Sequence, residues 1–176
     1  MCPGYEADGL SLLVGYMRIM ALDYGSVTVG VAMTDPLGIT VQPKETITRK
    51  QENHLRRTYS RIEEIVREEA VECIVVGLPL NMDGSEGERA ALCRQFGAKV
   101  QERTGVEVFF QDERLTTVEA DEVLDMLKID HKDRKKHIDA IAAAIILNDF
   151  VNDTKGSKSY AGARSAQQTD KVSSRA

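Results

Sequence analysis

Acidic residues at the ends of apolar segments are the side chains of this chain that are best placed to do chemistry. Residues 20–32 run through an apolar stretch to Asp23, turn at Gly25 and return as a second apolar stretch. This pattern predicts a β-hairpin whose first strand ends at Asp23. A carboxylate there adds nothing to a core, because burying an unpaired charge is costly. Asp23 therefore either faces solvent or binds a ligand.

Three more acids stand at the end of a predicted strand or the start of a predicted helix. Asp112 and Glu113 come directly after the apolar stretch 106–111, and Asp139 stands in the first turn of a helix that we predict over 136–151. Functional side chains in open α/β sheets gather at the carboxyl ends of strands. We therefore expect these acids to meet the acid of the hairpin at one edge of a sheet.

The residues that share a helix face with Asp139 favour a close approach of this helix to the sheet and to Asp23. Ala142, Ala143 and Ile146 share a face with Asp139, and small side chains there let a helix lie close to a sheet. Carboxylates from separate segments repel one another unless a cation neutralises them. Oxygen donors without a matching set of His or Cys favour Mg²⁺ or Mn²⁺. Such an ion suits the attack of water on a phosphodiester.

Each acid also has a simpler interpretation. Asp112 and Glu113 could cap the strand end or pair with Arg114, and the helix dipole alone favours an acid at Asp139. The loop 77–87, with its glycines and a proline, could be turn chemistry alone. The combination of acids, rather than any one of them, favours the functional interpretation.

The remaining pattern predicts an α/β domain with a mixed sheet. Ser85 with Glu88, and Thr116 with Glu119, have the spacing of a capping box, and each pair predicts the start of a helix. Basic residues are densest in 131–137, which we expect to be a solvated loop. The expected strands are 18–22, 29–34, 46–48, 73–77 and 106–111, and the expected helices are 52–69, 85–103, 116–128 and 136–151.

Length and composition limit the class of protein. The 176 residues suffice for one domain with a sizeable core. We expect an irregular extension over 1–16, a domain over 17–152 and a disordered polar tail over 153–176. No apolar run is long enough to cross a bilayer, and the net charge of −5 argues against non-specific coating of nucleic acid. The three cysteines lack metal-ligand spacing, which predicts free thiols in a reducing cytoplasm.

Four segments resemble the YqgF/RuvX family in their order and spacing. They are Leu22–Gly25, Gly77–Gly87, Asp112–Thr117 and Ile138–Ala143, and the resemblance extends over about residues 17–151. It implies a ribonuclease H-like fold, with a mixed five-stranded sheet flanked by helices. Members of the family are described as Holliday junction resolvases and as the nuclease that trims the 5′ end of pre-16S ribosomal RNA.

The resemblance implies a catalytic, metal-binding set of Asp23, Asp139 and one of Asp112 and Glu113, with Mg²⁺ or Mn²⁺ as the ion. Adjacent strand residues point to opposite faces, and analogy with related resolvases favours Glu113. We assign the nucleic-acid contacts of such an enzyme to Arg114, Lys132, Arg134, Lys135, Lys136, Asn81 and Ser85. Many members carry a basic residue about where this chain has Thr28, so that phosphate contact lacks its cation here.

The resulting hypothesis is a cytoplasmic, metal-dependent endonuclease that processes the 5′ end of pre-16S ribosomal RNA. Its expected partners are structured precursor RNA and the small ribosomal subunit, with the protein a monomer or weak homodimer and no membrane involved. The alternatives are a Holliday junction resolvase that cuts branched DNA, and a non-catalytic RNA- or ribosome-binding module. An actin-like or sugar-kinase-like ATPase is a further rival, but such proteins need two domains of this size. The sequence shows no aromatic platform for stacking bases, so it does not separate RNA from DNA.

Overall fold

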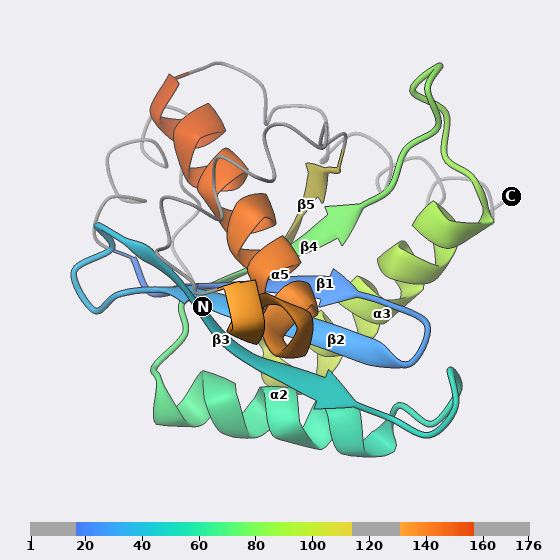
Figure 1. The fold of residues 1–176 in the computed structure, drawn as a ribbon, viewed down its shortest axis with the longest axis horizontal. Coiled ribbons are helices and arrows are strands. Elements are labelled where there is room, and N and C mark those ends of the chain that lie inside the picture. The colour runs from blue at the N-terminus through green and yellow to red at the C-terminus, as the bar shows by residue number, and fades with distance from the viewer. Residues whose placement is uncertain (1–16, 114–130, 157–176) are drawn as a thin grey trace, which may run out of the picture.

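The computed structural model describes residues 17–113 and 131–156, which form a five-stranded sheet with helices on both faces (Figure 1). The strand order is β3-β2-β1-β4-β5. The elements are β1 (Ile19–Tyr24), β2 (Thr28–Thr34), β3 (Val41–Thr48), α2 (Arg56–Glu68), β4 (Cys73–Leu78), α3 (Glu88–Thr104), β5 (Val108–Asp112) and α5 (His131–Gly156). The predicted α/β domain with a mixed sheet is confirmed.

The first two strands form the predicted hairpin. β1 pairs antiparallel with β2, and Asp23 lies directly opposite Gly30. β1 runs parallel to β4, and β4 runs parallel to β5. The carboxyl ends of these three strands therefore lie at one edge, where open α/β sheets place their functional groups.

The two faces of the sheet pack against different helices, because side chains alternate along a strand. On one face, Leu22 belongs to an apolar core that includes Ile62 of α2 and Phe96 of α3. On the other face, Ala21 and Ala32 pack against α5. Figure 1 shows α5 crossing the sheet over β1 and β2, with α2 and α3 on the far side. The small residues of this second face let α5 lie close to the strands.

β3 is longer than the sequence indicated. It spans Val41–Thr48 rather than 46–48 and pairs antiparallel with β2, with a register shift between Val31 and Ala32. Pro43 and the charged residues beside it obscured the strand in the sequence. The sheet tolerates them because β3 is an edge strand, where a missing backbone donor leaves no ladder bond unmade.

α3 begins at Glu88, so the helix start predicted at Ser85 is wrong. Gly87 precedes the helix in an extended conformation, and no side chain caps it. The backbone N–H and the hydroxyl of Ser85 both donate to the Asp83 carboxylate, at 2.9 and 2.6 Å. These local hydrogen bonds hold Ser85 in a turn and compete with the helical conformation that the capping-box spacing suggested.

α5 is longer at both ends than the predicted 136–151. It begins at His131, so the basic segment is helical rather than a loop, because Lys and Arg are good helix formers. It continues through 153–156, which the sequence placed in the tail. The Gln111 amide donates a hydrogen bond of 2.9 Å to the Asp153 carboxylate, which fastens this end of α5 to β5.

Some sequence predictions fall outside the described residues. They concern the extension 1–16, Arg114, the helix over 116–128 and the tail from 157 onward. In the part of the chain that the structure describes, no helix combines the length and the apolar character that a membrane span requires.

Candidate active site at the carboxyl edge of the sheet

Asp23 lies near the carboxyl end of β1, and its side chain is partly buried. Alternation along β1 places this side chain on the face that α5 covers, together with Ala21, whereas Tyr24 faces the other core. The turn that follows is closed by a hydrogen bond of 2.9 Å from the Gly25 N–H to the Thr28 carbonyl. The hairpin thus delivers Asp23 to the edge as the sequence predicted.

Glu113 reaches the same face from the end of β5. Its backbone N–H donates to the Leu78 carbonyl at 3.0 Å, which continues the parallel ladder one residue past the strand. A Cβ at Gly77 would lie 3.2 Å from Glu113 Oε2, so the absence of a side chain at 77 leaves room for this carboxylate. Asp112, one residue earlier, points to the opposite face. Of the two neighbouring acids, the structure therefore brings Glu113 toward Asp23.

Asp139 comes from α5, where the helix crosses β2. A Cβ at Gly30 would lie 1.8 Å from the carbonyl oxygen of Asp139, so the helix backbone rests directly on this glycine. Gly30 is the ladder partner of Asp23. Ala140 and Ala143 are fully buried and keep the helix close to the sheet. The glycine therefore sets Asp139 beside Asp23.

The pKa of Asp23 reflects this convergence. Burial, followed by the charges of Glu113 and Asp139, raises the pKa of Asp23 from its ordinary 3.8 to about 7, against the opposing effect of Arg89. Burial also raises the pKa of Glu113, which Arg89 again opposes. Asp23 and Glu113 are thus harder to ionise than in water, chiefly because burial disfavours their charged forms.

Arg89 is a candidate site residue that the sequence did not reveal. It lies in the first turn of α3, where its guanidinium donates to the Tyr24 carbonyl at 2.6 Å and pairs with Glu52 at 2.7 Å. Its charge lowers the pKa of both Asp23 and Glu113. In the sequence Arg89 resembles any charged helix residue, because these partners are brought to it only by the fold.

Arg49 steadies the turn that follows Asp23. Its side chain is 7% exposed, and its guanidinium donates to the carbonyls of Ser26 and Thr28 at 3.0 and 3.1 Å. The same group lies 4.9 Å from the centre of the Tyr24 ring. Several bonds from one buried cation thus fix the hairpin turn, and with it the position of the acid.

The other predicted contact residues are less closely tied to the acids. The Asn81 amide donates to the Ser85 hydroxyl at 2.9 Å, so both side chains brace the loop between β4 and α3. This loop projects beyond the sheet in Figure 1. Four basic residues that we predicted to contact nucleic acid lie in the first turns of α5, shortly before Asp139. They are Lys132, Arg134, Lys135 and Lys136. Arg114 lies outside the described residues.

The donor set at this edge fits a hard divalent cation. Asp23, Glu113 and Asp139 offer carboxylate oxygens, the ligands that Mg²⁺ and Mn²⁺ prefer. Among the described residues no group of three His, Cys, Asp or Glu side chains is already arranged to hold a metal. A bound cation would offset the mutual repulsion of the three carboxylates.

The strand order and the helices on both faces define the ribonuclease H-like fold. The structure of Thermus thermophilus RuvC matches with a TM-score of 0.55 at 15% identity, over 77% of this chain and 96% of that one. The same protein in complex with a Holliday junction substrate matches with a TM-score of 0.55 at 16% identity, over 77% of this chain and 95% of that one. At such identities the likeness shows the fold alone.

Sequence comparisons narrow the class to one family. The family model described as "RuvX: Holliday junction resolvase" matches residues 17–153. A Lachnospira eligens protein named "Putative pre-16S rRNA nuclease" is 57% identical over 135 residues, which cover 77% of this chain and 96% of that protein. An Agathobacter rectalis protein of the same name is 47% identical over 143 residues, 81% of this chain and 100% of that protein. The chain belongs to the RuvX family, and the resemblance seen in the sequence is confirmed.

Proposed function

We propose that this chain is a divalent-metal-dependent endonuclease that processes the 5′ end of pre-16S ribosomal RNA. The observation that carries the proposal is the meeting of Asp23, Glu113 and Asp139 at the carboxyl edge of a ribonuclease H-like sheet. The high identity to proteins named as pre-16S rRNA nucleases supports this substrate over others.

In this proposal the three acids hold Mg²⁺ or Mn²⁺, which when bound stabilises the attacking and leaving oxygens of phosphodiester hydrolysis. The raised pKa of Asp23 means that its carboxylate must lose a proton to serve as a ligand near neutral pH. Arg89 supplies positive charge at the same edge, where it can receive a phosphate oxygen of the substrate. Arg114 and the basic residues of 132–136 position further phosphates, a role that carries little sequence information.

The proposed setting is the cytoplasm, with precursor RNA on the small ribosomal subunit as the partner. Cys73 and Cys93 are buried free thiols, which suits a reducing compartment. The net charge of −5 predicts weak affinity for RNA alone, because 28 acidic residues outnumber the 23 Lys and Arg that could neutralise phosphates. A monomer or weak homodimer suffices to cut one RNA strand.

Holliday junction cleavage is the second candidate, and the description of the family model favours it. A resolvase must cut two strands symmetrically and therefore acts as a dimer. The two candidates differ in both substrate and assembly, so one assay separates them.

The test is a cleavage assay with a precursor 16S RNA fragment and a four-way DNA junction, each in Mg²⁺, Mn²⁺ or chelator. The wild type is compared with an Asp23→Asn, Asp139→Asn double variant. We expect metal-dependent cutting of the RNA that the double variant loses. Cutting of the junction alone would transfer the protein to recombination. Cutting by the double variant at the wild-type rate would overturn the proposed site, and binding without cutting would favour an RNA-binding module.

A further inference from the structure

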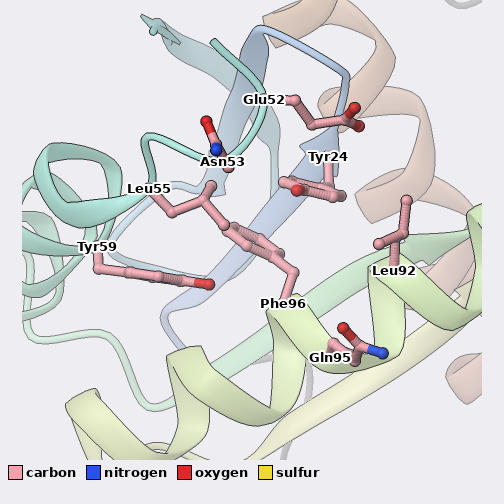
Figure 2. A pocket seen from close by; sticks show the side chains of 8 residues that line it. All are labelled: Tyr24, Glu52, Asn53, Leu55, Tyr59, Leu92, Gln95 and Phe96. Atoms are coloured by element: carbon pink, nitrogen blue, oxygen red, sulfur yellow. The ribbon is translucent and has the colours of Figure 1, made fainter.

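An open groove of about 670 Å³ lies on the face of the sheet opposite the acids. Tyr24, Phe96 and Tyr59 form its aromatic floor. Tyr24 stacks on Phe96 with ring centres 4.3 Å apart, and Tyr59 stacks on Phe96 at 5.6 Å. Figure 2 shows Phe96 reaching from α3 toward Leu55 and Tyr24. The fold thus gathers from distant segments an aromatic cluster that the sequence did not reveal.

The groove adjoins the candidate active site through β1 and through Arg89 of α3. Tyr24 follows Asp23 directly, so β1 contributes an acid to one face of the edge and an aromatic ring to the other. Arg89 stands between the two, because it bonds the Tyr24 carbonyl and Glu52 of the groove and its charge also reaches Asp23. Its guanidinium lies 5.1 Å from the centre of the Tyr24 ring. Arg89 therefore contacts residues of the groove and also acts electrostatically on the acids of the candidate active site.

The lining offers the chemistry that recognises a nucleobase. Leu55 and the exposed Leu92 add apolar walls to the aromatic floor. Asn53, Gln95 and Glu52 form an exposed polar rim of amide and carboxylate groups, which can pair with donors and acceptors on a base edge. Because Tyr24 and Phe96 stack on one another and are buried, a base would pack against the partly exposed Tyr59 ring and the leucines.

Resting on the proposed function, we propose that this groove binds one unpaired nucleobase of the RNA substrate, from a nucleotide adjacent to the phosphodiester held at the acids. In this arrangement the scissile phosphate lies at Asp23, the neighbouring phosphate lies near Arg89, and the base turns over the edge of the sheet. A base inside a duplex cannot make this turn, because it is stacked and paired. The groove therefore selects single-stranded RNA around the cleavage site.

The test measures binding in chelator, so that no cleavage is needed. A fluorescein-labelled single-stranded fragment of the precursor is titrated with wild type, Gln95→Trp and Leu92→Ala, and binding is followed by fluorescence anisotropy. We expect Gln95→Trp to fill the groove and weaken binding about tenfold, and Leu92→Ala to weaken it about threefold. Ala98→Trp is the matched control, since Ala98 is exposed on the same helix and outside the groove. Thermal unfolding establishes that each variant folds.

A second probe identifies the base itself. The same fragment is made with an abasic nucleotide beside the cleavage site, and a duplex of the same sequence serves for comparison. We expect the abasic probe to bind the wild type about tenfold more weakly than the intact fragment, and to bind Gln95→Trp as the intact fragment does. The duplex should not distinguish Gln95→Trp from the wild type.

Equal binding of the intact and abasic probes to the wild type would overturn the proposal. So would a Gln95→Trp variant that binds the fragment normally and is impaired only on the assembled small subunit, because the groove would then contact a protein. A chain that shows these binding differences but never cuts RNA would retain the groove and lose the proposed function. RNA cleavage that no groove variant affects, with unchanged binding, would retain the proposed function and overturn the groove proposal.

Discussion

Asp112 and Glu113 are neighbours in the chain, yet the pleat of the strand sends their side chains to opposite faces of the sheet. The ladder bond of Glu113 to Leu78 and the space beside Gly77 identify Glu113 as the acid that approaches Asp23. The sequence could name the pair but not choose within it, because the register of β5 against β4 is a tertiary property.

Substitution of the two neighbours separates their roles. We expect Glu113→Gln to lower metal-dependent RNA cleavage at least about a hundredfold, because it removes a charged oxygen ligand. Asp112→Asn, the matched control, should retain the wild-type rate within about threefold, since its side chain lies on the other face. Single-turnover cleavage in saturating Mg²⁺ measures both. A larger loss for Asp112→Asn than for Glu113→Gln would contradict the assignment.

Because its pKa is raised in the fold, Asp23 makes the free energy of unfolding decrease as pH rises. Its pKa of about 7 in the fold exceeds its ordinary 3.8, so between these values the folded state keeps a proton that the unfolded state has lost. Stability from this group is full below about pH 4 and falls as pH rises to about 7. Asp23→Asn removes the loss, so in chelator it should exceed the wild type in stability by ~2 kcal/mol at pH ~8.

Urea unfolding of Asp23→Asn and the wild type near pH 4 and pH 8 measures this difference. The two proteins should differ little near pH 4, where Asp23 is protonated in the folded state and still about half protonated in the unfolded state. A wild type that gains stability relative to Asp23→Asn as pH rises would show that burial and the neighbouring acids do not raise the pKa of Asp23.

The close approach of α5 to the sheet depends on Gly30, which has no side chain. The carbonyl of Asp139 occupies the place of a side chain at this position, so the backbones of helix and strand are in contact. Neither can yield as a flexible side chain would. We expect Gly30→Ala to cost ~3 kcal/mol or more of stability and to displace Asp139 from the acids.

Gly87→Ala is the control for this substitution. A Cβ there would lie 3.4 Å from the Asn81 amide oxygen, an ordinary contact, and the backbone of Gly87 is one that alanine adopts. Thermal unfolding and the cleavage rate should both fall for Gly30→Ala and change little for Gly87→Ala. An unaltered Gly30→Ala protein would show that α5 does not dock on this glycine.

The elements could be predicted where their pattern is strong and local. The apolar run at 73–77 and the turn at Gly25 predicted β4 and the hairpin, and with them the edge where the acids meet. The ends of elements were less predictable. Ser85 satisfies a capping-box spacing but bonds Asp83 instead. The sequence of β3 lacks a regular alternation of apolar and polar residues, although its burial alternates over Val41–Lys44. Such outcomes depend on tertiary neighbours, which a local pattern does not contain.

The molecule as a whole places the acids and the aromatic groove on opposite faces of one edge, with Arg89 between them. The sequence could not predict the groove, because its floor joins β1, α2 and α3. A protein that concentrates negative charge at a partly buried edge is stabilised when a cation binds there. Metal binding should therefore be visible in the stability of the whole fold.

We expect Mg²⁺ to raise the melting temperature of the wild type, and more so at about pH 8 than at about pH 6. The reason is that Mg²⁺ need not displace a proton from Asp23 once pH exceeds its pKa of about 7. The double variant Asp23→Asn, Glu113→Gln should lose the effect. Differential scanning fluorimetry in Mg²⁺ and in chelator measures it, and an equal rise in the double variant would place the bound metal elsewhere.

The most direct measurement is the position of the metal itself. Crystals grown in Mn²⁺ would be measured at the manganese edge, and the anomalous signal would locate the ion without reference to any assay. We expect a peak in contact with carboxylate oxygens of Asp23, Glu113 and Asp139. A protein that cuts RNA with Mn²⁺ while its manganese lies away from these three acids would contradict it.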